Sequence, residues 1–141
     1  MNKTKSGLEQ LEVLVGTWVV ESKKYSEGLG QTTVTPIEDG KYLRLESKQE
    51  DERFPRSTQL IGSDDASDEC TVLYFDGRGV RRVYRMTVEG GVWTMWRDAP
   101  GFNQRYVGRI SSDGQTIAGQ WEMSKDGIHW DDDFDLTYRK Q

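Results

Sequence analysis

The feature that most constrains the fold is an alternation of apolar and polar side chains that fills the chain from residue 17 onward. This period of two is typical of strands in a sheet with one buried face. Short turns such as EGG (89–91), SDG (112–114) and KDG (125–127) separate the segments, and their residues tolerate positive φ. The pattern predicts about ten strands in consecutive hairpins. They are expected over residues 17–26, 32–38, 41–50, 56–63, 70–76, 79–89, 92–98, 103–111, 115–123 and 128–139.

A different pattern precedes the first strand. Ser6 is a candidate N-cap, Leu8, Leu11 and Leu14 follow at helical spacing, and Gly16 ends the segment. We therefore predict a short N-terminal helix. Because consecutive hairpins with one apolar face tend to close and remove their edges, the expected fold is all-β: a ten-stranded up-and-down antiparallel β-barrel with this helix under one end.

Composition agrees with a barrel. The 141 residues suit one domain, expected to span 1–141. Apolar residues make up 34% and charged residues 30% of the chain, which is low for a helical bundle but sufficient where only every second residue faces a core. Cys70 is the only cysteine, and neither a secretion signal nor an apolar run of membrane-spanning length is present. We expect a cytoplasmic protein.

Charge is unevenly distributed. The formal net charge is −5, yet residues 78–109 contain seven arginines, no lysine and two acidic residues. Arginine forks suit carboxylates and phosphates. The overall acidity and the missing lysines argue against a nucleic-acid partner.

Alternation also assigns faces to these arginines. Arg82 shares the apolar face of its strand with Tyr84, whereas Arg81 and Arg85 alternate with them and are expected outside. We likewise expect Arg105 and Arg109 on the outer face, opposite in parity to Tyr106 and Ile110. The outer arginines should then form one positive patch.

The opening of the first strand carries a family resemblance. GTW at residues 16–18, after a short helix, resembles the Gly-x-Trp motif of the calycin superfamily, which includes lipocalins and fatty-acid-binding proteins. The layout of the second half resembles uncharacterised bacterial lipocalin-like proteins related to nitrobindin. The resemblance implies that Gly16 and Trp18 belong to the barrel closure, that Trp18 plugs one end, and that Arg139 of the last strand packs over it.

The resemblance also implies ligand binding rather than catalysis. We expect a small hydrophobic or amphiphilic ligand, anionic and fatty-acid-like, inside the barrel. Arg82 would bind its head group with help from Gln104, Tyr84 and Tyr106. Trp96 and Trp121 would form the apolar wall, although strand 92–98 is ambiguous because Trp93 and Trp96 point in opposite directions. Alternatively, aromatic side chains fill the core and Arg82 pairs with Glu46 or Glu122.

Two further readings stay open. Nitrobindin-like relatives bind haem through a histidine near the C-terminus, and His129, the only histidine, is the candidate by position. The chain can also be a ligand-free interaction module, such as a homodimer. We expect no catalytic residues, because no G-x-S-x-G accompanies His129, and no metal site, because clustered Cys and His are missing. The DDDFD segment (131–135) is expected to be a solvated strand face.

Overall fold

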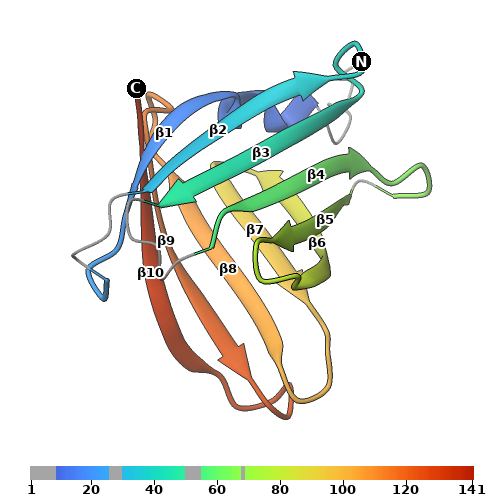
Figure 1. Cartoon of the computed structure of the whole chain (residues 1–141), viewed down its shortest axis with the longest axis vertical. Helices are drawn as coiled ribbons and strands as arrows, with labels where there is room; N and C mark the ends of the chain where they lie inside the picture. Colours follow the sequence, from blue (N-terminus) through green and yellow to red (C-terminus); the bar gives the residue numbers. More distant parts are fainter. Residues whose placement is uncertain (1–8, 26–29, 50–54, 68) are drawn as a thin grey trace.

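A computed structural model describes residues 9–25, 30–49, 55–67 and 69–141. In this part of the chain, ten antiparallel strands form one closed barrel, in which every strand pairs with its chain neighbours and β1 closes on β10 (Figure 1). The predicted all-β up-and-down barrel is confirmed. The strands are β1 (Gly16–Glu21), β2 (Gly30–Ile37), β3 (Tyr42–Gln49), β4 (Ser57–Ser63), β5 (Cys70–Asp76), β6 (Arg81–Glu89), β7 (Val92–Arg97), β8 (Asn103–Ile110), β9 (Thr116–Ser124) and β10 (Asp131–Lys140).

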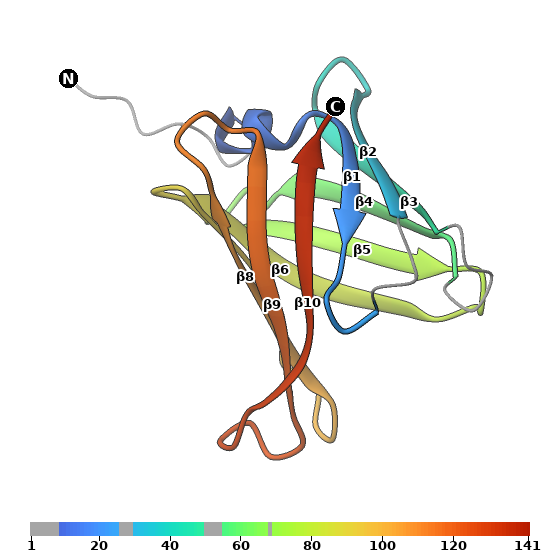
Figure 2. The same cartoon turned by 90° about the vertical axis from the view of Figure 1, so that its left-hand side faces the viewer.

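The predicted N-terminal helix is a short 3-10 helix, η1 (Glu9–Leu14). It crosses the end of the barrel at which β10 finishes (Figure 2). Leu11 and Leu14 are 0% and 2% exposed, so η1 closes this end with apolar side chains. In the described residues we find no helix with the length and apolar character that crossing a membrane requires.

Trp18 lies directly beneath this helix. It is 1% exposed, and its indole Nε1 donates a hydrogen bond to the Leu14 carbonyl over 2.8 Å. The ring of Tyr138 meets the Trp18 ring edge-on at 6.4 Å between centroids. The side chain therefore joins the helix, the first strand and the last strand.

The residue that covers Trp18 differs from the prediction. Arg139 pairs in register with Val19, points outward and binds Glu21 with an Nε–Oε1 distance of 3.0 Å. Lys140 is the register partner of Trp18, and its Nζ lies 5.2 Å from the Trp18 ring centroid. The prediction for Arg139 was wrong by one residue, because the alternation along β10 places Tyr138 and Lys140 inside.

The end of the barrel opposite η1 is open and uneven. There β8, β9 and β10 extend beyond the other strands (Figures 1 and 2). The last strand starts at Asp131, later than expected, because the Asp126 carboxylate accepts hydrogen bonds from the backbone N–H groups of Ile128 and His129 and holds a wider turn. A register shift between Asp132 and Phe134 marks a β-bulge at the start of β10.

Candidate ligand-binding cavity

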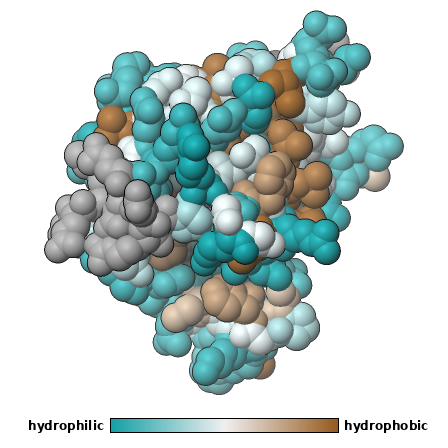
Figure 3. Space-filling model, viewed as in Figure 1, coloured by the Kyte–Doolittle hydropathy of each residue, from teal (hydrophilic) through white to brown (hydrophobic). Residues whose placement is uncertain are grey.

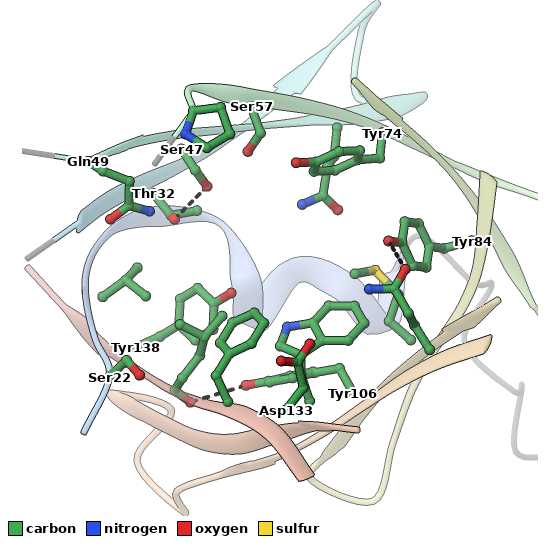
Figure 4. Close-up of a pocket in the computed structure, with 18 of the residues that line it drawn as sticks. Ser22, Thr32, Ser47, Gln49, Ser57, Tyr74, Tyr84, Tyr106, Asp133 and Tyr138 are labelled. Carbon is green, nitrogen blue, oxygen red and sulfur yellow. Dashed lines mark hydrogen bonds between the residues drawn. The ribbon is translucent and has the colours of Figure 1, made fainter. Parts of the chain in front are cut away.

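A cavity of about 450 Å³ occupies the open half of the barrel. This volume lies within the range of small-molecule sites in proteins. Figure 4 shows its two contrasting walls, with Thr32, Ser47, Ser57 and Gln49 on one side and Tyr106 and Tyr138 on the other. The cavity is therefore polar over β2, β3 and β4 and aromatic over β7 to β10.

The aromatic wall is a continuous cluster. Ring centroids lie 5.2 Å apart for Trp93 and Tyr106, 5.4 Å for Tyr106 and Trp121, and 6.3 Å for the stacked pair Trp121 and Phe134. Tyr106 lies over the backbone of Gly119, where an added Cβ would stand 2.2 Å from its hydroxyl. The absence of a side chain at Gly119 makes room for the tyrosine ring.

Arg82, Tyr84 and Gln104 form a polar group near the open end. The Tyr84 hydroxyl donates to Gln104 Oε1 over 2.9 Å, and one Arg82 nitrogen lies 3.5 Å from the same oxygen. The Arg82 guanidinium also lies over the Phe102 ring, 5.3 Å from its centroid. Burial raises the pKa of Tyr84, partly offset by the neighbouring Arg82, so the phenol is protonated at neutral pH.

The other charged side chains in the lining have ionic partners. Glu21 binds Arg139 at 3.0 Å, Arg78 binds Asp76 at 2.7 Å, and Asp133 lies 3.9 Å from Lys24 Nζ. Arg82 is half-buried, and among the described residues it has no carboxylate within salt-bridge distance. Arg82 thus presents the one cation of the described lining that a protein carboxylate does not neutralise.

Asp76 organises the rim beside Arg82. Its carboxylate accepts hydrogen bonds from the Tyr74 hydroxyl at 2.8 Å and from Arg78 Nη2 at 2.7 Å. The hydrogen bond from Arg78 has the largest effect, and together these bonds hold the pKa of Asp76 well below its usual range, although burial acts to raise it. Burial and the bond to Asp76 raise the pKa of Tyr74 to about 12.

Five of the predicted ligand-binding residues come together in this lining. They are Arg82, Tyr84, Gln104, Tyr106 and Trp121.

The sixth, Trp96, was assigned wrongly. It pairs in register with Arg85 and Arg105 on the outer face, whereas Trp93, on the opposite parity, is 3% exposed and lines the cavity. The register with the neighbouring strand identifies the inward-facing tryptophan, because Trp93 pairs with Val88, which sequence alternation places on the inner face of β6.

The carboxylates considered for Arg82 lie elsewhere. Glu46 binds Arg44 at 2.6 Å and Glu122 binds Arg105 at 2.8 Å, both on the outer face. Asp133, expected outside, lines the cavity rim because the β-bulge in β10 adds one residue before Phe134.

The outer face carries the arginines in the expected positions, but the charge patch is interrupted. Arg81, Arg85 and Arg109 are exposed, and Arg105 stacks on Trp130 at 3.9 Å. Arg85 binds Asp64 at 2.9 Å and Arg105 binds Glu122, so two of the four are paired.

Apolar side chains also emerge on the outside of β5 and β6. Leu73, Phe75 and Val83 are 48%, 44% and 58% exposed. Apolar surface is visible on the side of the molecule that holds β4, β5 and β6 (Figure 3).

His129 lies outside the cavity. It belongs to the turn between β9 and β10, at the tip of the extended strands (Figure 1), and its side chain is 85% exposed. Its Nδ1 lies 2.6 Å from Asp126 Oδ2. Because no histidine belongs to the described lining, these residues do not fit a histidine-ligated haem inside the barrel. Among the described residues we also find no group of three His, Cys, Asp or Glu side chains that could hold a metal ion.

Comparison with known proteins supports the fold. The crystal structure of Rv2717c from M. tuberculosis is similar to this chain, with a TM-score of 0.69 and 15% identity over 99% of each chain. At this identity the likeness shows the fold alone, and the ten-stranded barrel fits a calycin-like architecture. No family model and no curated protein matches the sequence.

Proposed function

We propose that this protein binds a small amphiphilic ligand with an anionic head inside the barrel, without transforming it. The observation that carries the proposal is the half-buried Arg82 guanidinium, which lines the cavity and has no carboxylate partner among the residues that the structure describes. A buried charge is costly unless it is paired, so an anionic group is the natural complement. Arginine is suited to this task because its planar fork donates two parallel hydrogen bonds to a carboxylate.

The neighbouring groups support the same head position. Gln104 Oε1 accepts a hydrogen bond from the Tyr84 hydroxyl and lies 3.5 Å from Arg82 Nη1. This contact restrains the guanidinium at the cavity wall. The aromatic wall supplies the apolar surface that the rest of the ligand requires. Aromatic faces of this kind contact alkyl chains and stack on planar rings.

The chemistry of the lining favours binding over catalysis. Burial raises the pKa of Tyr84, Tyr106 and Tyr138, so the phenols stay protonated and donate hydrogen bonds rather than act as bases at neutral pH. The single histidine lies outside the cavity. Decanoic acid carries a carboxylate for Arg82 and an alkyl chain for the aromatic wall, so it is a suitable first probe of the site.

The test compares decanoic acid with decanol by isothermal titration calorimetry. Wild-type protein should prefer the acid, and Arg82→Met should weaken acid binding about tenfold to a hundredfold while leaving decanol unaffected, because a hydrogen bond to a charged group contributes roughly 1.5–3 kcal/mol. Arg81→Met, on the outer face of the same strand, is the matched control and should bind as wild type. Equal affinity for acid and alcohol, or equal losses in both variants, would contradict the proposal.

A further inference from the structure

The first half of β6 pairs with another strand on one side only. Residues 85–89 pair with β7, whereas, among the strands that the structure describes, residues 81–84 pair with β5 alone. β7 ends at Arg97, one residue beyond its last pair with β6. Figure 2 shows β6 running across the view while β8 and β9 extend downward. Residues 81–84 therefore form a sheet edge, which we call the β6 edge.

The β6 edge carries backbone groups that lack a strand partner on this side. Near its start, the Asp76 N–H donates a hydrogen bond to the Val80 carbonyl over 3.0 Å, so Val80 faces β5. Successive residues of an antiparallel strand alternate in the side toward which their N–H and C=O groups point. Arg81 and Val83 must then point away from β5. Their two donors and two acceptors match the requirement of an added strand.

A groove of about 590 Å³ lies along this edge. Its lining includes Arg81 and Val83 from β6, Arg97 from the end of β7, and Ala99 from the loop that follows. Arg81 is exposed and Val83 is 58% exposed, so the groove is open to solvent. An extended chain can therefore approach the edge from outside the barrel.

Apolar side chains border the groove on the outer face. Leu73 and Val83 are register partners and are 48% and 58% exposed, and Phe75 on the same face of β5 is 44% exposed. All three belong to the lining. A segment that covered them would remove apolar surface from water, which favours association.

The groove is also positively charged. Its lining contains three arginines and one acidic residue, namely Arg81, Arg82, Arg97 and Asp98. Among the described residues, no carboxylate lies within salt-bridge distance of Arg81 or Arg97. A second copy of this chain would bring like charges together at the same edge, whereas an acidic segment complements them.

We infer that the β6 edge binds an extended acidic segment of another protein, which adds to the barrel wall as a strand antiparallel to β6, as β7 does further along. The backbone of this segment pairs with Arg81 and Val83. Its apolar side chains lie beside Val83 on the outer face, and its acidic side chains, on the opposite face, approach Arg97. This interaction does not depend on the ligand proposed for the cavity.

Amide hydrogen exchange, measured by NMR on the whole protein, tests the pairing. The probe is a capped hexapeptide of alternating glutamate and valine. Without it, the N–H groups of Arg81 and Val83 should exchange faster than those of Arg82 and Tyr84, which face β5. At a free peptide concentration near ten times the Kd, exchange at Arg81 and Val83 should slow about tenfold, because only the unbound fraction exchanges.

Two N-methylated peptides are matched controls for backbone pairing. In the proposed register the valines oppose Val83 and turn their N–H groups toward β6, so N-methylation of the valines should abolish the protection. N-methylation of the glutamates should preserve it, and a hexapeptide of alternating lysine and valine should give none. Equal binding of both methylated peptides, or no protection by the parent peptide, would overturn the inference.

The other possible occupants of the edge give different results. Protection of Arg81 and Val83 that rises with protein concentration in the absence of peptide would mean that a second copy covers the edge. Binding to phosphatidylglycerol vesicles without any response to the peptide would mean that the groove meets a membrane surface. Either result would refute a peptide partner.

Variants test the location of the site. Val83→Thr keeps a β-branched side chain but adds a polar group, and Arg97→Gln removes a charge, so each should weaken binding of the parent peptide about threefold. Val107→Thr and Arg109→Gln make the same changes on the outer face of β8 and should bind the peptide as wild type. Unchanged affinity in both edge variants, or equal losses in the β8 variants, would show that the peptide binds elsewhere.

Discussion

Gly119→Ala tests the packing that shapes the cavity. An alanine Cβ at this position would stand 2.2 Å, 2.3 Å and 2.6 Å from the Tyr106 hydroxyl, Cζ and Cε1 atoms. Contacts this short do not persist, so the ring or the strand must move. Tyr106 is 1% exposed and has Trp93 and Trp121 within 5.4 Å between centroids, which leaves the cavity as the open direction.

The free energy of unfolding should fall by about 2 kcal/mol, the middle of the range for overpacked cores. Urea denaturation followed by tryptophan fluorescence measures this change. Because the displaced ring occupies cavity space, binding of decanoic acid should weaken in parallel. Gly77→Ala is the control: its added Cβ meets its nearest neighbour, the Arg56 carbonyl oxygen, at 4.0 Å, so its unfolding free energy should change little.

A double-mutant cycle identifies the cause. In a Tyr106→Leu background the side chain lacks the hydroxyl, Cζ and Cε1 atoms, so Gly119→Ala should lower the unfolding free energy by less than about 0.5 kcal/mol there. The reasoning is refuted if the substitution is equally destabilising in both backgrounds, or if it is neutral in the wild type. In either case Tyr106 would not lie against Gly119 as described.

Two further predictions concern charge and titration. Because the pKa of Tyr74 is raised to about 12 from an unfolded value near 10, the unfolded chain releases this proton first, and the unfolding free energy should decline as pH rises from about 10 to about 12. Asp76→Asn should lower the Tyr74 pKa in a spectrophotometric titration, and an unchanged value would contradict the role given to the carboxylate. Urea titrations should show that Arg81→Ala changes the unfolding free energy by less than about 0.5 kcal/mol and Arg82→Ala lowers it by more than about 1 kcal/mol, through lost contacts with Gln104 and Phe102. The reverse order would mean that the faces of β6 are exchanged.

The barrel was predictable because each strand is specified locally. Alternation gives the buried face, and a tight turn gives the next antiparallel partner, so connectivity follows without long-range information. The errors arise where one residue changes parity. Asp133 turns inward at a bulge whose extra residue has no distinct sequence signal, and β10 starts late because Asp126 holds its turn.

The tryptophans of β7 show a second kind of error. Trp93 and Trp96 have opposite parity, so one strand read alone cannot decide which faces the cavity. The register with β6 decides it, because Trp93 opposes the buried Val88 while Trp96 opposes the exposed Arg85. A hairpin loop of known length fixes this register, so the two-residue turn 90–91 contained the answer.

The existence of a cavity follows from a change along three strands. On the inner faces of β2, β3 and β4, side chains near η1 are apolar and buried, and those toward the open end are polar and mostly smaller. With the residue near η1 given first, the pairs are Val34 and Thr32 in β2, Leu45 and Ser47 in β3, and Ile61 and Ser57 in β4. A barrel that filled its own interior would place large apolar residues along the whole face. Here short hydroxyl side chains face the aromatic wall and leave space between them (Figure 4), with Thr32 and Ser47 bonded to each other at 2.8 Å. Apolar burial at one end therefore stabilises the fold, and the other end is left with the cavity in which we propose that an amphiphilic ligand binds.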